Sequence, residues 1–332
     1  MEEIIESLRP ISRCLDTIQS ILALDFLNGR LTDVHGAQKS LGRVGILSCF
    51  LGTVWGIHVS FGCFLLWFSS NFPSFFPPPK VAMILTWCFY IAAMCTFHLS
   101  EFFVTAFSNP TVVASNSFLV NHSKAYTAAS IIAGMEFWLG FWSAGDSSSG
   151  DSGDDITSYG TTMSVLWLTT TMVGIAVVIA SQMMRSWAMM KCGESFNHYI
   201  QTQRKENHVL VTDGIYTWFR HPSYTGFYYW SIGTQVVLHN PISAVLFAVA
   251  GWKFFSQRIP YEERSLVRLF GNRYYNYVGR TYVGIPFIPS IPKEEECHRA
   301  QQSQQQQEKE EHEKGATVEV EAEKEGHQKK TK

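Results

Sequence analysis

The chain has 332 residues, of which 46% are hydrophobic, 14% aromatic and 16% charged, and its net charge is −2 at pH 7. With no general excess of basic residues, this balance argues against nucleic-acid binding through a basic surface. The seven cysteines are scattered without a CxxC pair, so the sequence indicates neither a zinc site nor a disulfide framework. Most of them are expected to act as small hydrophobic residues inside helices.

The first 43 residues are expected to form a cytosolic or interfacial N-terminal segment (1–43). Residues 1–6 carry three acidic side chains where a signal peptide would carry a basic start, and no small-residue cleavage site follows. Residues 11–27 are moderately apolar but include Arg13, Asp16 and Asp25. We therefore expect an amphipathic helix that lies at the membrane surface or packs on other helices, with a full span as the less favoured alternative.

Residues 44–184 are expected to hold four transmembrane helices. About 20 apolar residues cross the hydrocarbon core of a bilayer, and long stretches here lack Asp, Glu, Lys and Arg. A Pro-rich segment at 71–79 predicts a loop, Asn109-Pro110 ends the second span, and an acidic Ser/Gly/Asp loop precedes the fourth. The predicted spans cover residues 44–68, 81–107, 125–142 and 161–184.

Two shorter apolar runs, 223–238 and 242–252, are separated by His239-Asn240-Pro241. Each is too short to cross a bilayer comfortably alone, so together with their flanks they predict a tight helical hairpin through the membrane. The expected fold is an all-α integral membrane protein with about six transmembrane helices, including this C-terminal hairpin, and a cytosolic cofactor site formed by the late polar segments.

The distribution of Lys and Arg predicts the orientation of the chain. Basic residues gather before the first span, between the fourth and fifth spans and after the hairpin, whereas the loop between the third and fourth spans has four aspartates and no basic residue. Because cytosolic loops carry excess Lys and Arg, both termini are expected in the cytosol.

Residues 291–332, rich in Gln, Glu and Lys, predict a disordered cytosolic tail. Its end resembles a dilysine retrieval signal of the endoplasmic reticulum, although such lysines are common by chance in this composition.

Three ionisable residues lie inside predicted spans, namely His98, Glu101 and Glu136. Ionisable groups are costly there, so they either line a polar path or form hydrogen bonds to neighbouring helices that hold the bundle together. We favour the second interpretation.

Residues 185–290 are expected to form the catalytic region, because polar and charged side chains crowd beside apolar runs only here. Pro222 suits the first turn of a helix, whose free backbone N–H groups, with the hydroxyl of Ser223, favour an anion. Arg258 and Glu262 share one helical face, so they either pair on the surface or belong to a site at the mouth of the hairpin. No metal is expected, because His198, His208 and His221 lack ligand spacing and a Cys or acidic partner. No GxSxG motif surrounds Ser223, which argues against a serine nucleophile.

Several segments resemble the isoprenylcysteine carboxyl methyltransferases, and the resemblance covers roughly residues 44–290. The segments are GESFNHYIQ, HVLVTDGIYTWFRHPSYTGFYYWSIGTQVVLHNPIS, WKFFSQRIPYEERSL and GIPFI, preceded by SCFLGTVWG, FHLSEFFVTAFSNP and SFLVNHSKAYTAA. The resemblance implies an enzyme of the endoplasmic reticulum membrane. Such an enzyme uses S-adenosyl-L-methionine to methylate the C-terminal carboxylate of a farnesylated or geranylgeranylated cysteine in CaaX-processed proteins of the small GTPase type.

The resemblance also implies roles for individual residues. Arg185, Arg258 and Glu262 match residues of the family's catalytic site, and Arg258 matches the position assigned to substrate. The positions that match cofactor contacts are Gln201, His208, Val209, Leu210, Val211, Tyr216, His221, Pro222, Ser223, Tyr224 and Glu262. This chain differs from the family's pattern in its N-terminal spans, the Pro-rich insertion, the acidic loop and the tail. All of these differences lie outside this site.

The chemistry agrees with this assignment. A C-terminal carboxylate has a pKa of about 3.5 and is already ionised at neutral pH, so the nucleophile needs orientation rather than a general base. One alternative is a related membrane enzyme, such as a phospholipid N-methyltransferase or a sterol reductase. Another alternative is a non-enzymatic transporter or scaffold. The concentration of polar residues in one late stretch, rather than in broken helices of paired repeats, argues against it.

Overall fold

The computed structural model describes residues 2–22, 41–72, 78–120, 124–144, 156–196 and 209–288. Within these ranges the chain is almost entirely helical, with one isolated β-bridge between Phe219 and Tyr282. The α-helices are α1 (Glu2–Leu22), α2 (Leu41–Asn71), α3 (Pro78–Ser108), α4 (Lys124–Ser143), α5 (Ile156–Cys192), α6 (Pro222–Val237), α7 (Pro241–Phe270) and α8 (Asn272–Val278). Short 3-10 turns occur at η3 (Ser115–Phe118), η4 (Gly193–Ser195) and η5 (Gly214–Thr217).

Each predicted apolar segment is helical. Among the described residues, three helices are long and apolar enough to cross a membrane, namely α2, α3 and α5. Two expected boundaries were wrong. Pro78 begins α3 instead of belonging to the preceding loop, because the first turn of a helix tolerates the missing N–H of proline. The helix of the second hairpin arm does not end with the apolar run 242–252 and a short flank, because α7 continues through Pro260 to Phe270.

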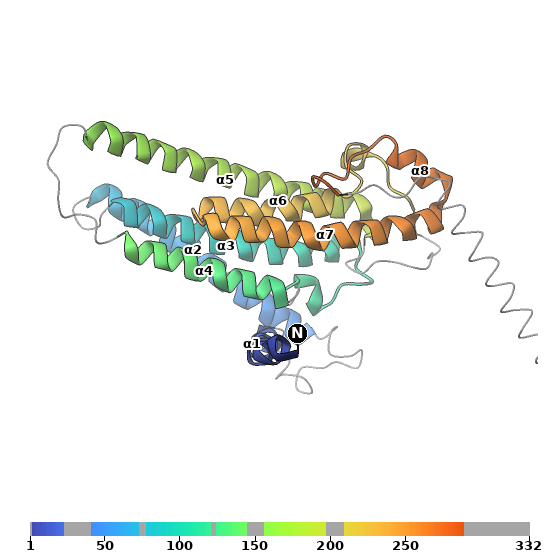
Figure 1. Ribbon diagram of the computed structural model, residues 1–332, viewed down its shortest axis with the longest axis horizontal. Coiled ribbons are helices and arrows are strands. Elements are labelled where there is room, and N and C mark those ends of the chain that lie inside the picture. Colours follow the sequence, from blue (N-terminus) through green and yellow to red (C-terminus); the bar gives the residue numbers. More distant parts are fainter. Residues whose placement is uncertain are drawn as a thin grey trace, which may run out of the picture.

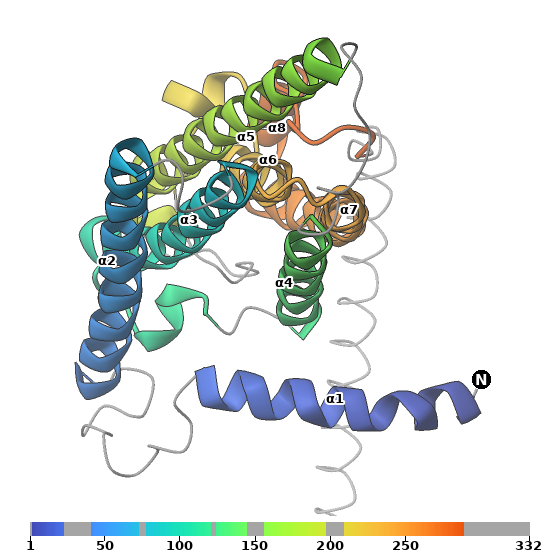
Figure 2. The same cartoon turned by 90° about the vertical axis from the view of Figure 1, so that its left-hand side faces the viewer.

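The long helices run side by side, and α6 lies between α5 and α7 (Figures 1 and 2). In contrast, α1 crosses the direction of the bundle near the start of α4. Lys124 of α4 forms an ion pair with Asp16 at 2.6 Å and a hydrogen bond to Ser12 at 3.2 Å. This contact agrees with the expected packing role of the N-terminal helix, which is not among the helices apolar enough to span a membrane.

Glycines bring α5 and α6 into backbone contact. A Cβ atom at Gly226 would lie 2.8 Å from the carbonyl oxygen of Ser181 and 2.9 Å from Cβ of Arg185. A Cβ at Gly174 of α5 would similarly overlap Val237 of α6, and a Cβ at Gly233 of α6 would overlap Val177 of α5. Small residues allow membrane helices to approach this closely. The close crossing holds Arg185 against the first turns of α6.

The turn between α6 and α7 is held by two other helices. His239 adopts a left-handed conformation with φ of 57°, and its Nε2 lies 2.8 Å from Oγ1 of Thr171 on α5. The side-chain amide of Asn240 donates to the carbonyl of Ala133 on α4 at 2.9 Å. The hairpin is therefore pinned to the bundle at the end opposite α8 (Figure 1).

The ionisable residues in the predicted spans bond to neighbouring elements, as we favoured. Nδ1 of His98 lies 2.8 Å from the carbonyl oxygen of Phe118. Glu136 accepts the backbone N–H groups of Ile242 at 2.9 Å and Ser243 at 2.7 Å, so a carboxylate of α4 caps the first turn of α7. Glu101 contacts α5 and is described with the site.

Candidate active site

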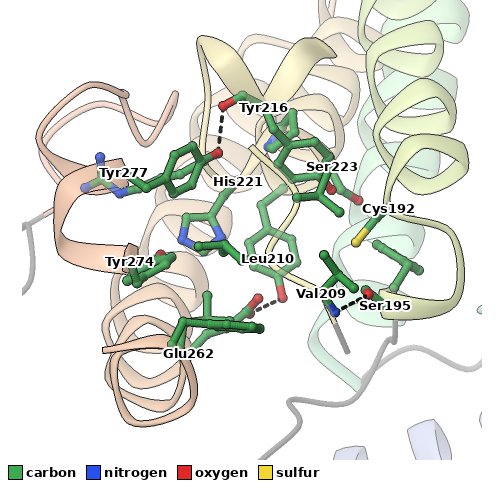
Figure 3. A pocket seen from close by; sticks show the side chains of 17 residues that line it. Cys192, Ser195, Val209, Leu210, Tyr216, His221, Ser223, Glu262, Tyr274 and Tyr277 are labelled. Carbon is green, nitrogen blue, oxygen red and sulfur yellow. Dashed lines mark hydrogen bonds between the residues drawn. The ribbon is translucent and has the colours of Figure 1, made fainter. Parts of the chain in front are cut away.

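A pocket of about 120 Å³ lies at the end of the bundle where α5 ends, α6 begins and α8 packs on α7 (Figures 1 and 3). The segment 209–217 forms one of its walls. Its lining residues are Cys192, Ser195, Phe196, Val209, Leu210, Val211, Tyr216, Arg220, His221, Pro222, Ser223, Tyr224, Glu262, Leu266, Phe270, Tyr274 and Tyr277.

The pocket brings together the residues expected to contact a cofactor. The residues that line it are Val209, Leu210, Val211, Tyr216, His221, Pro222, Ser223, Tyr224 and Glu262. Gln201 and His208 lie outside the described residues. Arg185 and Arg258, which were expected to act in catalysis, are not among the lining residues.

Sequence reasoning did not select several of the lining residues. Leu266 and Phe270 follow Glu262 at intervals of four on α7, so helical periodicity from Glu262 would have found them. Tyr274 and Tyr277 belong to α8, a separate short helix, and reach the pocket only because the chain turns after Phe270. No local pattern marked these two tyrosines.

The wall formed by 209–217 is fixed at both ends. Val209 donates its backbone N–H to Oγ of Ser195 at 3.2 Å, and the hydroxyl of Tyr277 donates to the carbonyl of Tyr216 at 2.7 Å (Figure 3). The Tyr216 hydroxyl donates to the carbonyl of Ala188 on α5 at 3.2 Å. Burial raises the pKa of Tyr216 well above its ordinary value, so the phenol stays a neutral donor.

The wall contains a turn at Thr212-Asp213-Gly214. Gly214 has φ of 63°, a conformation that glycine adopts without steric cost. Lys191 at the end of α5 forms an ion pair with Asp213 at 2.5 Å. The hydrogen bond from Lys191 lowers the pKa of Asp213 below its ordinary value. Both side chains are solvent-exposed, so the pair contributes little stability.

The first turn of α6 points its backbone N–H groups toward the pocket end of the helix. Pro222 occupies its first position and Ser223 its second, as the sequence predicted. Pro222 has no N–H, and Tyr224 and Thr225 donate theirs to the carbonyl of His221 at 3.1 and 3.0 Å. What this turn offers a ligand is therefore the N–H of Ser223 and the partial positive charge of the helix N-terminus. The ring of His221 stacks on that of Tyr224 at 5.5 Å with an interplanar angle of 4°. This arrangement suits a ligand with an anionic group and a flat apolar part.

A buried ionic network lies directly behind this turn. Arg220 Nε lies 2.5 Å from Oε1 of Glu263, and His221 Nε2 lies 3.1 Å from the same oxygen. Burial acts to raise the pKa of Glu263, but the hydrogen bond and charge of His221 and the charge of Arg220 lower it below its ordinary value. Because an ionised carboxylate only accepts hydrogen bonds, Nε2 of His221 carries a hydrogen.

Tyr224 joins the pocket to Arg258. Its hydroxyl donates to Oε2 of Glu262 at 2.5 Å and accepts from Nε of Arg258 at 2.9 Å. The Arg258 guanidinium also lies over the Tyr224 ring at 5.3 Å and the Phe254 ring at 5.8 Å. Arg258 and Glu262 are thus linked through a phenol from another helix.

Arg185 lies behind the pocket wall rather than inside it. Its Nε and Nη2 donate to the two carboxylate oxygens of Glu101 on α3, the second at 2.9 Å. Its Nη1 donates at 3.1 Å to both the carbonyl oxygen and Oγ of Ser223. Both charged side chains are buried. In this structure Arg185 therefore contacts a pocket residue instead of lining the pocket.

The segment after α8 returns to the start of α6. Arg220 donates its backbone N–H to the carbonyl of Tyr282 at 2.9 Å, and Oγ1 of Thr225 donates to the carbonyl of Val283 at 3.1 Å. Gly284 has φ of 94°, and a Cβ there would lie only 2.2 Å from Oγ1 of Thr225. Only glycine fits this approach, so the GIPFI segment packs closely against the start of α6.

The described residues contain no cluster of three or more His, Cys, Asp or Glu side chains able to hold a metal ion. The site is built instead from aromatic rings, a helix N-terminus and two acidic residues of α7, Glu262 and Glu263. This donor set suits an organic ligand that carries both charged and flat apolar groups.

Comparisons with known proteins place these features in a family. The family model for isoprenylcysteine carboxyl methyltransferases matches residues 172–268. The protein-S-isoprenylcysteine O-methyltransferase of Xenopus laevis is 38% identical over 268 residues, which are 81% of this chain and 81% of that protein. The enzyme of the same name from Saccharomyces cerevisiae is 42% identical over 199 residues, 60% of this chain and 79% of its own.

A solved structure gives the same result in three dimensions. It is described as the eukaryotic intramembrane Ras methyltransferase, an isoprenylcysteine carboxyl methyltransferase, without a monobody. The TM-score is 0.61 at 30% sequence identity, and the match covers 87% of this chain and 88% of the other. Because the similarity extends over most of both chains rather than over the pocket alone, this chain belongs to the isoprenylcysteine carboxyl methyltransferase family.

Proposed function

We propose that the chain is a protein-S-isoprenylcysteine O-methyltransferase, which methylates the C-terminal carboxylate of a prenylated cysteine. The observation that carries this proposal is the meeting of two environments at Tyr224. On one side lies a polar pocket with a helix N-terminus, and on the other lies Arg258, in the helix that continues the apolar arm of the hairpin. A water-soluble donor and a lipid-soluble acceptor can meet at such a junction.

The pocket is proposed to bind S-adenosyl-L-methionine, which when bound supplies an electrophilic methyl group. The residues present fit this cofactor. The first turn of α6 and the Ser223 hydroxyl suit its carboxylate, Glu262 suits its cationic groups, and the tyrosine rings suit its base. The hydroxyl of Tyr274, which lines the pocket, is buried without a hydrogen-bond partner among the described residues, which is costly unless a polar ligand satisfies it.

Arg258 is proposed to orient the substrate carboxylate, and Glu262 to act with it at the reacting centre. Arginine binds carboxylates with fixed geometry, and Tyr224 holds the Nε edge of this guanidinium toward Glu262. Because the carboxylate is ionised at neutral pH, no residue has to remove a proton from it. The contribution of these residues is therefore alignment of the nucleophile.

The membrane location of the chain has a physical reason. A farnesyl or geranylgeranyl group gains about 0.8 kcal/mol per buried CH₂, on the order of 10 kcal/mol in total, so its extraction into water is expensive. We propose that the prenylated proteins are of the small GTPase type and that the hairpin receives the prenyl chain from the bilayer.

The proposed topology has about six membrane-crossing helices, with both termini and the pocket on the cytosolic side of the endoplasmic reticulum membrane. In this topology residues 1–43 form the interfacial segment, 44–184 the first four spans, 185–290 the catalytic region and 291–332 the tail. The α5 helix crosses the boundary at residue 184 without a break, so the catalytic region is continuous with the fourth span.

The experiment that tests the function uses the full chain in lipid nanodiscs with N-acetyl-farnesylcysteine and methyl-labelled S-adenosyl-L-methionine. The expected product is the labelled methyl ester. N-acetylcysteine and phosphatidylethanolamine are the matched control substrates for the prenyl requirement and for phospholipid N-methylation. Absence of the ester at saturating cofactor, or preferential labelling of the phospholipid, would contradict the proposal.

A further inference from the structure

Two buried charged residues from different predicted spans meet behind the pocket. Glu101 of α3 is 1% exposed, and Arg185 of α5 is 6% exposed. The carboxylate of Glu101 accepts hydrogen bonds from both Nε and Nη2 of Arg185. An ionisable side chain in a membrane helix is costly unless it is paired, so each residue offsets the cost of burying the other in this position.

The pair leaves one edge of the guanidinium directed at the pocket wall. Nη1 of Arg185 donates at 3.1 Å to the carbonyl oxygen of Ser223 and at 3.1 Å to its Oγ. Ser223 lines the pocket from the second position of α6. Because Oγ accepts from a cation, the hydroxyl hydrogen of Ser223 stays available as a donor to another group.

The guanidinium has little freedom to turn. Phe97 and Phe227 lie over it, with ring centroids 5.3 Å and 5.4 Å from Cζ. The backbone at Gly226 approaches so closely that a Cβ there would lie 2.9 Å from Cβ of Arg185. Rings and backbone fix the plane of Arg185. Within that plane the carboxylate of Glu101 holds the edge formed by Nε and Nη2, while Ser223 accepts from Nη1.

We propose that Glu101 is a positioning residue for the methyl transfer, acting through Arg185 to hold Ser223 and the first turn of α6 in the orientation that binds the cofactor. The inference rests on the function proposed above. It assigns a role in cofactor binding to a carboxylate of α3, which reaches the pocket wall on α6 only through Arg185 of α5. Without this carboxylate the guanidinium would be an unbalanced buried cation and would turn toward another anion, so Ser223 would lose its partner.

Glu136 offers a matched control. It is the other carboxylate of the predicted spans that holds the start of a helix, because it accepts the N–H groups of Ile242 and Ser243 in the first turn of α7. That turn lies at the end of the hairpin away from the pocket (Figure 1). A Glu136→Gln change should therefore lower stability without altering cofactor binding.

The test compares Glu101→Gln with Glu136→Gln in the full chain. The readouts are thermal unfolding, KM for S-adenosyl-L-methionine, kcat at saturating cofactor and the calorimetric Kd for the cofactor. We expect Glu101→Gln to raise KM and Kd for the cofactor by about tenfold, the effect of losing a hydrogen bond to a charged group, with kcat at saturation little changed. Glu136→Gln should leave both cofactor constants at their wild-type values.

A second variant covers the case in which Glu101→Gln does not fold. The double variant Glu101→Gln/Arg185→Gln removes both buried charges together, which membrane helices tolerate better than the loss of one partner. It should still show the raised cofactor Kd, because Ser223 has lost its guanidinium. Wild-type cofactor Kd in either folded variant overturns the inference, whereas absence of ester product from the wild type counts against the proposed function alone.

Discussion

The hydroxyl of Tyr224 donates a hydrogen bond to Oε2 of Glu262 at 2.5 Å while it accepts one from Nε of Arg258 at 2.9 Å. Tyr224 stands in the first turn of α6, and both charged residues stand on α7. One phenol thus sets the relative position of the arginine and the carboxylate that are proposed to align the reactants.

Replacing the phenol of Tyr224 should lower catalytic efficiency, because Arg258 and Glu262 would lose the hydroxyl that links them. Tyr224→Phe keeps the ring that stacks on His221 but removes both hydrogen bonds. We expect kcat/KM to fall by about one to two orders of magnitude, since two hydrogen bonds to charged groups are lost. Steady-state kinetics with N-acetyl-farnesylcysteine measure this. Tyr229→Phe, on the same helix but partly exposed, is the control, and equal kinetics of the two variants would refute the role of the phenol.

Arg258→Ala should abolish detectable ester formation with the protein still folded, because the proposed carboxylate ligand is lost. Arg258→Lys should recover only part of the activity, since lysine cannot reproduce the guanidinium geometry. The solvent-exposed Arg264, later on α7, is the matched control, and Arg264→Ala should behave as wild type. Normal kinetics for Arg258→Ala would remove Arg258 from the site.

Glu262→Gln should weaken the cofactor rather than the lipid substrate. The change preserves shape at the pocket wall but removes the negative charge proposed to face the cationic cofactor. We expect the calorimetric Kd for S-adenosyl-L-methionine to rise about tenfold or more. An unchanged Kd together with a raised KM for N-acetyl-farnesylcysteine would move Glu262 to the substrate side.

Stability should depend on the ionisation of Glu263. Its pKa is lowered below the ordinary 4.5, after the opposing effect of burial, by the hydrogen bond and charge of His221 and the charge of Arg220. A depressed folded-state pKa stabilises the protein fully above the unfolded value, and this stability is lost as the pH falls through the folded value. Thermal unfolding in nanodiscs should therefore show a fall in Tm below pH 4.5 that Glu263→Gln reduces, alongside a lower Tm at pH 7. An identical pH profile in the variant would contradict this linkage.

Gly284→Ala should destabilise the packing of the GIPFI segment on the start of α6. Alanine is strained at a φ of 94°, and its Cβ would overlap Oγ1 of Thr225. The expected cost is about 1–3 kcal/mol from the backbone alone, visible as a lower Tm. Gly56→Ala is the control, because that glycine lies in α2 with open space around it, and alanine there should be neutral or stabilising. Equal Tm values for the two variants would show that the GIPFI segment does not need its glycine.

Much of this protein could be predicted from local sequence because local physics decides it. The absence of charge over long stretches predicted α2, α3 and α5, and the proline at the first turn predicted the start of α6. The motifs around Val209 and His221 predicted the pocket lining for the same reason, since their neighbours along the chain are also their neighbours in space.

The partnerships between distant segments depended on tertiary structure. Nothing in the sequence indicated that Glu101 would pair with Arg185, that Tyr224 would stand between Arg258 and Glu262, or that Tyr274 would reach the pocket. These contacts join residues on different helices, and their geometry depends on how closely α5 and α6 pack at Gly226 and where the chain turns after α7. The sequence alone therefore determined which stretches are helices and which stretch lines the pocket. Helix packing decided which charges face the pocket and which only hold its walls, because an ionic pair forms only where two backbones bring both groups within hydrogen-bond distance.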